Sequence, residues 1–241
     1  MNSVESDLAK EASTEVKPWF WTPVHPNTMK KILEMMAIDP NEDNRHLRLL
    51  DFGCGMGRYL AGFASHLAVE NLYGVDTDPE ALAQVRQAGF QCSPLHPNEA
   101  VLDFENNFFD GVFSSNVIEH IPRPLYLQYL SEIHRVLKPG GIFAVGAPNY
   151  PMKRVYDMFK AFKQPTRKER DYYLFDDPTH CNKASVFQVE RDLAVYFEDI
   201  RLMPSALFFQ KKIKALKKPD VQYRLRGWGD KFFGVCRKAK G

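Results

Sequence analysis

The sequence has 241 residues, a formal net charge of +2 at pH 7 and a hydrophobic fraction of 44%. This length is sufficient for a domain with a sizeable core, and so small a net charge does not by itself indicate a polyanionic partner. The four cysteines have irregular spacings and no CxxC pair, which argues against a disulfide framework or a zinc ribbon and favours reduced thiols.

Segments that would direct or anchor the chain to a membrane are not apparent. No apolar run approaches the roughly 18 residues that can span a bilayer, and residues 1–17 are polar, so we expect a cytoplasmic protein without a signal peptide or transmembrane segment. A lysine-rich stretch at 210–218 is either a solvated helix or loop, or a patch for peripheral contact with an anionic surface, phosphates or acidic substrates.

Predicted strands and helices alternate along most of the chain. An amphipathic helix at 27–38 comes first and is preceded by an aromatic, proline-containing segment. The insertion at 150–185 interrupts the alternation. The predicted strands are residues 47–52, 71–76, 90–95, 109–116, 142–148, 199–209 and 230–238, and the later helices are residues 58–67, 78–89, 123–137 and 186–197.

This alternation predicts an α/β fold of the Rossmann-like kind, with a seven-stranded, mostly parallel sheet and helices on both faces. The last two strands have no crossover helix of normal length between them. We therefore expect the last strand to close the sheet in the antiparallel direction. Residues 138–141, with the sequence KPGG, are expected to form a turn before the fifth strand.

A glycine-rich segment, LLDFGCGMGRY, follows the first strand and opens a helix. Gly53, Gly55 and Gly57 allow a sharp turn and close approach of the backbone to a ligand. Their GxGxG spacing differs from the GxGxxG spacing of pyrophosphate-binding turns. Asp51 precedes the turn and would repel a phosphate, whereas it would suit a cationic group.

The second strand ends with Asp76, whose carboxylate can accept hydrogen bonds from both ribose hydroxyls of an adenosine. In an open parallel sheet, ligands bind at the carboxyl ends of the strands. S-adenosylmethionine combines an adenosine with an ammonium and a sulfonium and has no phosphate, so these residues favour it over NAD. An NAD-dependent oxidoreductase is a lower-ranked alternative.

Five segments carry a resemblance to a known family. They are LLDFGCGMGRYL, LYGVDTDPEAL, FDGVFSSNVIEHIPRP, EIHRVLKPGGIFAVGAPN and DPTHCNKAS, within about residues 48–190. The sequence resembles the class I S-adenosylmethionine-dependent methyltransferases of the type 11 group, which includes the ubiquinone-pathway O-methyltransferases. The resemblance implies a single methyltransferase domain with an N-terminal cap (1–44), a cofactor-binding core (45–149), a lid or insertion (150–185) and a C-terminal part of the sheet (186–241).

The resemblance also implies roles for the residues at the strand ends. The glycines would line the methionine part of the cofactor, Asp51 would neighbour its amino group, and Asp76 would hold the ribose. The adenine position departs from the family, which usually has an acid where this sequence has an asparagine. The implied cofactor residues are Asp51, Gly53, Gly55, Gly57, Asp76, Thr77, Asn98, Glu99, Ser115 and Asn116.

Candidate catalytic residues follow the fourth strand, in the segment SNVIEHI. His120 has an unperturbed pKa of about 6.5, which suits a general base near neutrality, and Glu119 is adjacent. The alternative interpretation is that both side chains only brace the next helix.

A divalent-metal site is a less favoured alternative. Relatives with the pattern ExxEH hold a metal, and this sequence has Asn116, Glu119 and His120 in the corresponding pattern NxxEH, with His180 as a further ligand. Because an amide is a weaker ligand than a carboxylate, the favoured interpretation has no metal and places His180 against substrate or backbone.

The methyl acceptor is expected near aromatic residues of the flanking segments. Trp21, Tyr150, Tyr173 and His180 are the predicted substrate-binding residues. No RNA-binding motif is visible, so the expected partner is a small molecule and not a nucleic acid. The oligomeric state is not indicated by the sequence.

The predicted function is methyl transfer from S-adenosylmethionine to a small molecule, at a hydroxyl oxygen, with His120 as general base or orienting group. The alternatives are an N- or C-methyltransferase, an enzyme acting on a sugar, a lipid-linked precursor or an RNA end, and a non-catalytic S-adenosylmethionine-binding scaffold for another subunit.

Overall fold

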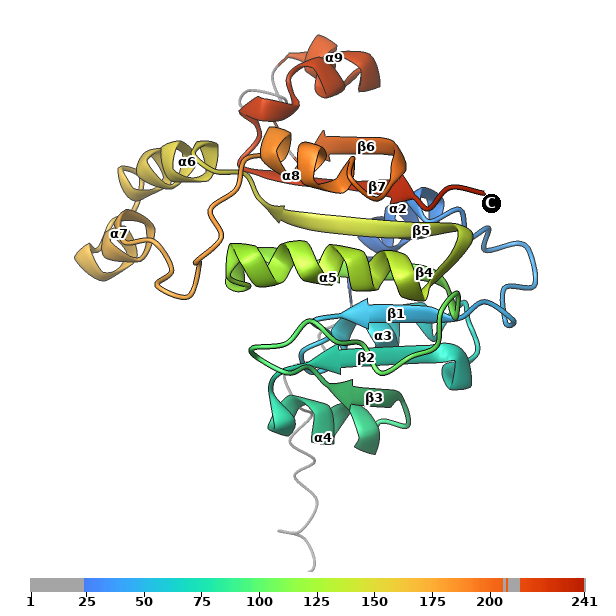
Figure 1. The fold of residues 1–241 in the computed structure, drawn as a ribbon. Helices are drawn as coiled ribbons and strands as arrows, with labels where there is room; N and C mark the ends of the chain where they lie inside the picture. Colours follow the sequence, from blue (N-terminus) through green and yellow to red (C-terminus); the bar gives the residue numbers. More distant parts are fainter. Residues whose placement is uncertain (1–23, 206, 208–212, 241) are drawn as a thin grey trace, which may run out of the picture.

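A single seven-stranded sheet organises the computed structural model, which describes residues 24–205, 207 and 213–240 (Figure 1). The strand order is β3-β2-β1-β4-β5-β7-β6, and β7 pairs antiparallel with both β5 and β6, while the pairs among β1 to β5 are parallel. This confirms the predicted fold, including the antiparallel last strand. The strands are β1 (Leu49–Phe52), β2 (Leu72–Asp76), β3 (Gln91–Pro94), β4 (Phe109–Ser115), β5 (Leu137–Pro148), β6 (Glu198–Pro204) and β7 (Lys231–Arg237).

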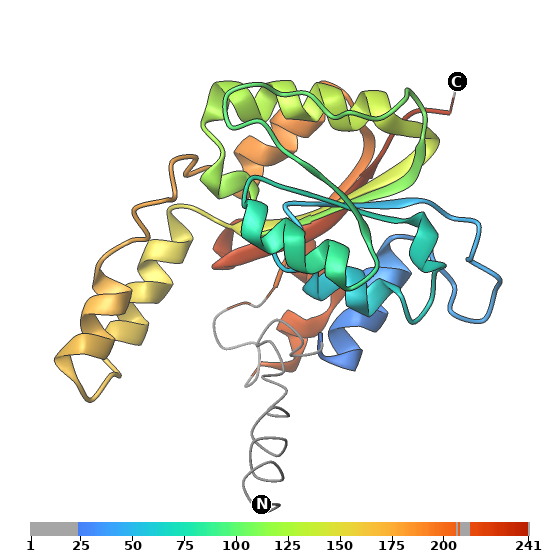
Figure 2. The same cartoon turned by 90° about the horizontal axis from the view of Figure 1, so that it is seen from below.

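Helices cover both faces of the sheet (Figures 1 and 2). Helices α5 and α8 pack on one face, whereas α2, α3 and α4 pack on the other. The helices are α2 (Pro26–Met35), α3 (Arg58–Phe63), α4 (Pro79–Gln87), α5 (Arg123–Val136), α6 (Met152–Ala161), α7 (Arg167–Leu174), α8 (Val186–Leu193) and α9 (Pro219–Arg224), and short 3₁₀ turns span Val69–Asn71, Ile118–His120, Lys214–Lys217 and Arg226–Trp228.

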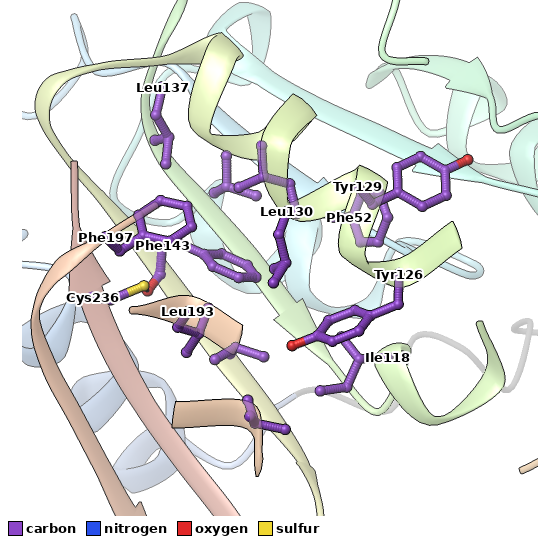
Figure 3. Close-up of a cluster of buried hydrophobic side chains, with 14 of the residues drawn as sticks. Phe52, Ile118, Tyr126, Tyr129, Leu130, Leu137, Phe143, Leu193, Phe197 and Cys236 are labelled. Carbon is purple, nitrogen blue, oxygen red and sulfur yellow. The ribbon is translucent and has the colours of Figure 1, made fainter. Parts of the chain in front are cut away.

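The core under α5 shows why this segment is helical. Tyr126, Tyr129, Leu130 and Ile133 recur at intervals of three and four residues, and all four are buried. They pack on the sheet together with side chains of β1, β5 and α8 (Figure 3). Truncating a buried leucine such as Leu130 to alanine would cost about 2–5 kcal/mol, so this face is a main source of stability.

The segment KPGG differs from its prediction as a turn. Strand β5 starts at Leu137, directly after α5, and pairs with β4 across an irregular step between Phe109 and Gly111. Gly140 has a φ of 78°, a left-handed conformation that glycine adopts without strain. The segment is therefore an irregularity within a long strand. Its backbone also bonds with the chain after β7, since Gly140 N donates to Lys238 O.

The insertion at 150–185 contains a helical hairpin, α6 and α7, that projects from the body of the molecule (Figures 1 and 2). The hairpin begins where β5 ends and returns to the same edge of the sheet before α8. In the part of the chain described above, no helix has both the length and the apolar character to cross a membrane.

Candidate functional site

The parallel strands bring the predicted site residues to one edge of the sheet. Asp51 lies near the end of β1, Asp76 ends β2, and Ser115 ends β4. Because these strands pair in parallel, their carboxyl ends face the same side, toward the α6–α7 hairpin (Figure 1). The predicted strand-end cluster is thus assembled by the sheet itself.

The glycine turn requires glycine for two different reasons. All three predicted glycines have positive φ, between 49° and 82°. A Cβ on Gly53 would lie 2.3 Å from a side-chain methyl of Val117, whereas a Cβ on Gly55 would meet no heavy atom within 4 Å. Gly53 is therefore needed for packing, and Gly55 leaves open space in which a ligand could approach the backbone.

Asp76 is tied to the turn by backbone hydrogen bonds. One carboxylate oxygen accepts from Gly55 N at 2.7 Å, and the other accepts from Asp78 N at 3.0 Å. Asp78 in turn caps α4 by accepting from Glu80 N. These bonds hold the Asp76 carboxylate in a fixed orientation while the side chain remains half-buried, and the adjacent Thr77 is exposed.

Asp51 is the most unfavourably placed acid of the site. It is 1% exposed, and its Oδ2 has no hydrogen-bond partner among the residues described. Burial, together with the nearby charge of Asp76, raises the pKa of Asp51 to about 8. A buried carboxylate without a partner is costly, and a cationic ligand group would relieve that cost.

His120 is oriented by a hydrogen-bond relay that was not predicted. The Thr179 hydroxyl donates to Asp177 Oδ1 at 2.5 Å and lies 2.9 Å from His120 Nδ1. Because the hydroxyl proton is used on the carboxylate, Nδ1 of His120 is the donor in the second bond. The neutral ring then carries its lone pair on Nε2. This is the arrangement of a general base oriented by a third group.

A second relay of the same kind orients His180. Tyr150 OH donates to Asp176, at 3.0 Å from Oδ1, and lies 2.6 Å from His180 Nδ1. Burial would raise the pKa of Asp176, but hydrogen bonds from Lys183, Lys153 and Tyr150 lower it well below its usual range. Tyr150 is 5% exposed, so it serves as an internal link of the relay.

The two histidines lie beside each other and beside Glu119. Their ring centroids are 4.7 Å apart, and one ligand atom from each histidine and from Glu119 lies within 4.8 Å of the others. Burial, together with the charge of His120, lowers the pKa of His180. Burial also raises the pKa of Glu119 to about 7, and Glu119 Oε2 has no partner within the described part of the chain.

Asn116, the fourth residue of the less favoured metal alternative, has other partners. Its amide nitrogen donates to Ser115 Oγ at 3.1 Å, and its amide oxygen accepts from Lys231 Nζ at 3.2 Å. Its φ of 56° is left-handed, a conformation that asparagine tolerates better than most residues. The Lys231 charge also acts on Glu119, where it lowers the pKa. An ammonium group here disfavours a bound cation.

Comparison with known proteins identifies the domain and its fold. Residues 50–145 match the family model described as a methyltransferase domain. The chain is also similar to an S-adenosylmethionine-dependent methyltransferase of known structure from Archaeoglobus fulgidus, with a TM-score of 0.62, 16% identity and coverage of 88% of this chain and 92% of the other. The chain carries an S-adenosylmethionine-dependent methyltransferase domain.

Curated relatives of this methyltransferase domain act at different atoms. It is 36% identical over 100 residues to a ubiquinone biosynthesis O-methyltransferase of Ruegeria pomeroyi, covering 40% of this chain and 39% of that protein. It is 29% identical over 146 residues to 24-methylenesterol C-methyltransferase 2 of Arabidopsis thaliana, covering 54% of this chain and 40% of that protein. The matches therefore span about two fifths of the lengths of these relatives.

The side chains present fit the cofactor of this methyltransferase family. S-adenosylmethionine carries an ammonium group and ribose hydroxyls and lacks a phosphate. The open space at Gly55, the unpaired carboxylate of Asp51 and the fixed carboxylate of Asp76 suit such a ligand. A pyrophosphate would meet two acids at the same place.

A cavity of about 940 Å³ adjoins the end of β4 in the methyltransferase domain. It lies on the α2 face of the sheet, over β6 and β7, and its lining includes Ser115, Asn116, Lys231, Phe232 and Phe233. Lys231 and Asn116, which are hydrogen-bonded to each other, therefore both line this cavity. Among the residues that the structure describes, none of the predicted substrate residues lines the cavity.

The remaining predicted residues have mixed positions. Asn98 and Glu99 lie exposed in the loop after β3, where Tyr129 OH donates to the backbone oxygen of Glu99. Tyr173 lies on α7 and contacts Lys160 of α6 through its ring face at 6.0 Å. Trp21 lies outside the described residues. The segment DPTH was visible in the sequence, but its link to His120 was not.

Proposed function

We propose that this chain transfers the methyl group of S-adenosylmethionine to a hydroxyl oxygen of a small molecule, with His120 as general base. The observation that carries the proposal is the relay from Asp177 through Thr179 to His120, which leaves Nε2 of the imidazole as the proton acceptor. A hydroxyl is a weak nucleophile, so its methylation benefits from removal of the proton during attack.

The strand-end residues would hold the cofactor. Asp51 would pair with the ammonium group, because burial leaves its carboxylate unpaired. Asp76 would accept from the ribose hydroxyls, since the backbone of Gly55 and Asp78 already fixes its orientation. When bound, the cofactor would supply an electrophilic methyl group. The predicted roles of Thr77, Asn98 and Glu99 beside the adenosine remain part of this proposal.

The two histidines would act on the acceptor hydroxyl, and the cavity would bind the remainder of the acceptor. His120 would take the proton, and His180, with a lowered pKa, would stay neutral and orient the acceptor hydroxyl. The cavity beside Ser115 and Asn116 would hold the rest of the acceptor. Its volume is in the range of small-molecule sites.

Methylation at nitrogen or carbon is the first alternative, and the sterol C-methyltransferase among the relatives supports keeping it. A second alternative is a metal ion held by Glu119, His120 and His180. The convergence of their ligand atoms favours it, whereas the positive charge of Lys231, which binds the neighbouring Asn116, disfavours it. A non-catalytic scaffold is a third, although a built relay would serve no purpose there.

The test is a screen of hydroxyl, amine and carbon acceptors that measures release of S-adenosylhomocysteine. With the acceptor found, we expect His120→Ala to lower kcat about 10²–10⁴-fold with little change in cofactor affinity. Thr179→Val should lower kcat about tenfold and shift the pH–rate profile, whereas Thr179→Ser, which keeps the hydroxyl, should restore both.

Three outcomes would contradict the proposal. A variant His120→Ala with undiminished turnover would remove His120 as the base, and unimpaired methylation in a complete extract by both His120→Ala and Asp76→Ala, with partner binding retained, would favour the scaffold. Turnover that falls with EDTA and returns with Mg²⁺ or Zn²⁺ would establish the metal alternative. Methylation of amines or carbon with no activity on any hydroxyl would replace the acceptor class.

A further inference from the structure

Helix α6 exposes an apolar stripe along one face. Val155, Met158, Phe159 and Phe162 are spaced at i, i+3, i+4 and i+7, which places them on the same side of the helix. Their exposed fractions are 36%, 51%, 50% and 81%, respectively. An amphipathic helix normally buries such a face against its own protein.

The opposite face of α6 fixes the direction of this stripe. Tyr156 OH donates to Trp228 O at 3.0 Å, and Lys153 Nζ lies 2.6 Å from Asp157 Oδ2. Tyr156, Asp157 and Ala161 are buried. The helix therefore cannot turn the stripe inward without breaking these contacts.

The stripe lies on a part of the molecule that projects away from the sheet. Helices α6 and α7 pack on each other and project as a hairpin (Figures 1 and 2). Two further apolar side chains lie at the end of α7, Leu174 as its last residue at 43% exposed and Phe175 directly after it at 72% exposed. The hairpin thus exposes apolar groups both at its tip, with Phe162, and near its base, with Leu174 and Phe175.

Positive charge is concentrated at the same tip. Residues 160–170 carry five basic side chains and one acidic one, whereas the whole chain has a net charge of only +2. Lys163, Arg167 and Arg170 are exposed, and Arg167 makes a loose ion pair with Asp171 at 3.7 Å. Apolar side chains flanked by lysine and arginine are typical of helices that lie in a membrane interface.

We propose that the α6–α7 hairpin docks on the surface of an anionic lipid bilayer. Met158 and Phe162 enter the boundary between headgroups and acyl chains, and Lys163 and Arg170 contact the lipid phosphates. The exposed lysine and arginine side chains of the hairpin complement lipid phosphates, whereas they would repel the same hairpin of a second copy. This favours an anionic bilayer over a second copy of the chain, and it does not depend on the identity of the methyl acceptor.

The test uses the purified full chain and sedimentation with vesicles. Vesicles of phosphatidylcholine alone are compared with vesicles that also contain phosphatidylglycerol. We expect at least about tenfold tighter binding to the anionic vesicles, weakening as salt is raised. Phe162→Ser should weaken this binding about five- to tenfold, and the double variant Lys163→Glu, Arg170→Glu should abolish the preference for anionic lipid.

Matched controls separate the hairpin from general surface effects. Val195→Ser changes an apolar side chain that is 71% exposed outside the hairpin, and the pair Arg45→Glu, Arg86→Glu changes two exposed charges elsewhere. Both controls should bind as the unchanged chain does. Unchanged melting temperatures of the hairpin variants would show that they remain folded.

Other results would overturn the proposal. Equal binding to neutral and anionic vesicles, or full binding by Phe162→Ser, would exclude the hairpin as a lipid contact. A dimer in sedimentation equilibrium that Phe162→Ser dissociates, without vesicle binding, would assign the stripe to a second copy of this chain. Salt-sensitive binding to polyglutamate but not to vesicles would assign it to an acidic protein.

Discussion

Burial of Asp51 lowers the stability of the ligand-free chain at neutral pH, and the same carboxylate is the proposed partner of the cofactor's ammonium group. Its unfolded pKa is close to 3.8, while burial raises the folded value to about 8. The folded state therefore holds the proton more tightly than the unfolded state. Stability from this group is complete below about pH 4 and is lost as pH rises toward the folded pKa.

Asp51→Asn should stabilise the ligand-free chain and weaken cofactor binding. We expect a gain on the order of 1–3 kcal/mol at neutral pH, or roughly 2–12 °C in Tm, because the folded chain must hold a proton on Asp51 that the unfolded chain releases, and an amide removes this difference. The gain should grow between about pH 4 and pH 8, where the carboxyl of Asp51 is ionised in the unfolded chain and still protonated in the folded chain. Differential scanning fluorimetry across this range measures it.

The matched measurement is affinity for S-adenosylhomocysteine by calorimetry, which should fall at least about tenfold in Asp51→Asn because the ammonium loses its partner. Glu80→Gln, an exposed acid on α4, is the control and should change neither quantity. A variant that binds with unchanged affinity would remove Asp51 from the cofactor site.

The sequence allows the glycine turn to be predicted at this scale, but not the histidine relays. Gly53, Gly55 and Asp51 lie within one short motif whose spacing has a direct physical meaning. His120 and Thr179 are 59 residues apart, and Tyr150 and Asp176 are 26 apart. No periodicity reports such a contact, since it depends on how the insertion returns to the sheet.

At the scale of elements, Asn149 joins four segments at the end of β5. Its side-chain nitrogen donates to Gly227 O and Gly229 O, and its side-chain oxygen accepts from Val186 N at the start of α8. Its backbone N donates to Asp230 O, just before β7. At 1% exposed, this residue connects the site edge to α8 and to the C-terminal part of the chain.

Asn149→Ala should destabilise the fold by about 2–4 kcal/mol, because three backbone groups lose their partner, two of them in fully buried bonds. Urea unfolding followed by circular dichroism gives the value. Asn27→Ala, at an exposed position in the first turn of α2, should stay within about 0.5 kcal/mol. Equal midpoints for the two variants would show that other bonds hold this junction.

Strands and helices were predictable because their apolar patterns are local, and the predicted order matches the observed one. The predictions that were wrong or incomplete concern features that depend on contacts between distant segments. KPGG has the composition of a turn, yet Leu137 pairs with Phe109 and extends β5 through it. The hairpin was predicted only as an insertion, since α6 exposes its apolar face and so lacks the usual relation between pattern and burial.

At the scale of the whole molecule, a cofactor that binds only the native state should raise its melting temperature. With S-adenosylhomocysteine at about 100 times its Kd, the expected stabilisation is about 2.7 kcal/mol. For a chain of this size that corresponds to roughly 5–11 °C. Thermal shift with S-adenosylhomocysteine and with NAD in parallel tests this.

NAD should produce no shift, because the two acids of the turn oppose a pyrophosphate. The Asp76→Ala variant is the matched control and should show a much smaller shift with S-adenosylhomocysteine than the unchanged chain. Stabilisation by NAD alone would overturn the assignment of the cofactor.

The hairpin is fixed at its base and unconstrained in length at its tip. Tyr150 on its way out and Asp176 on its way back meet through a hydrogen bond, and Lys153 adds an ion pair to Asp176 at 2.9 Å. The turn at the tip, after the buried Ala161, can therefore be shortened, extended or exchanged while the imidazoles keep their orientation. The orientation of the histidines and the proposed surface contact therefore depend on different parts of one hairpin, so each can change in evolution without the other.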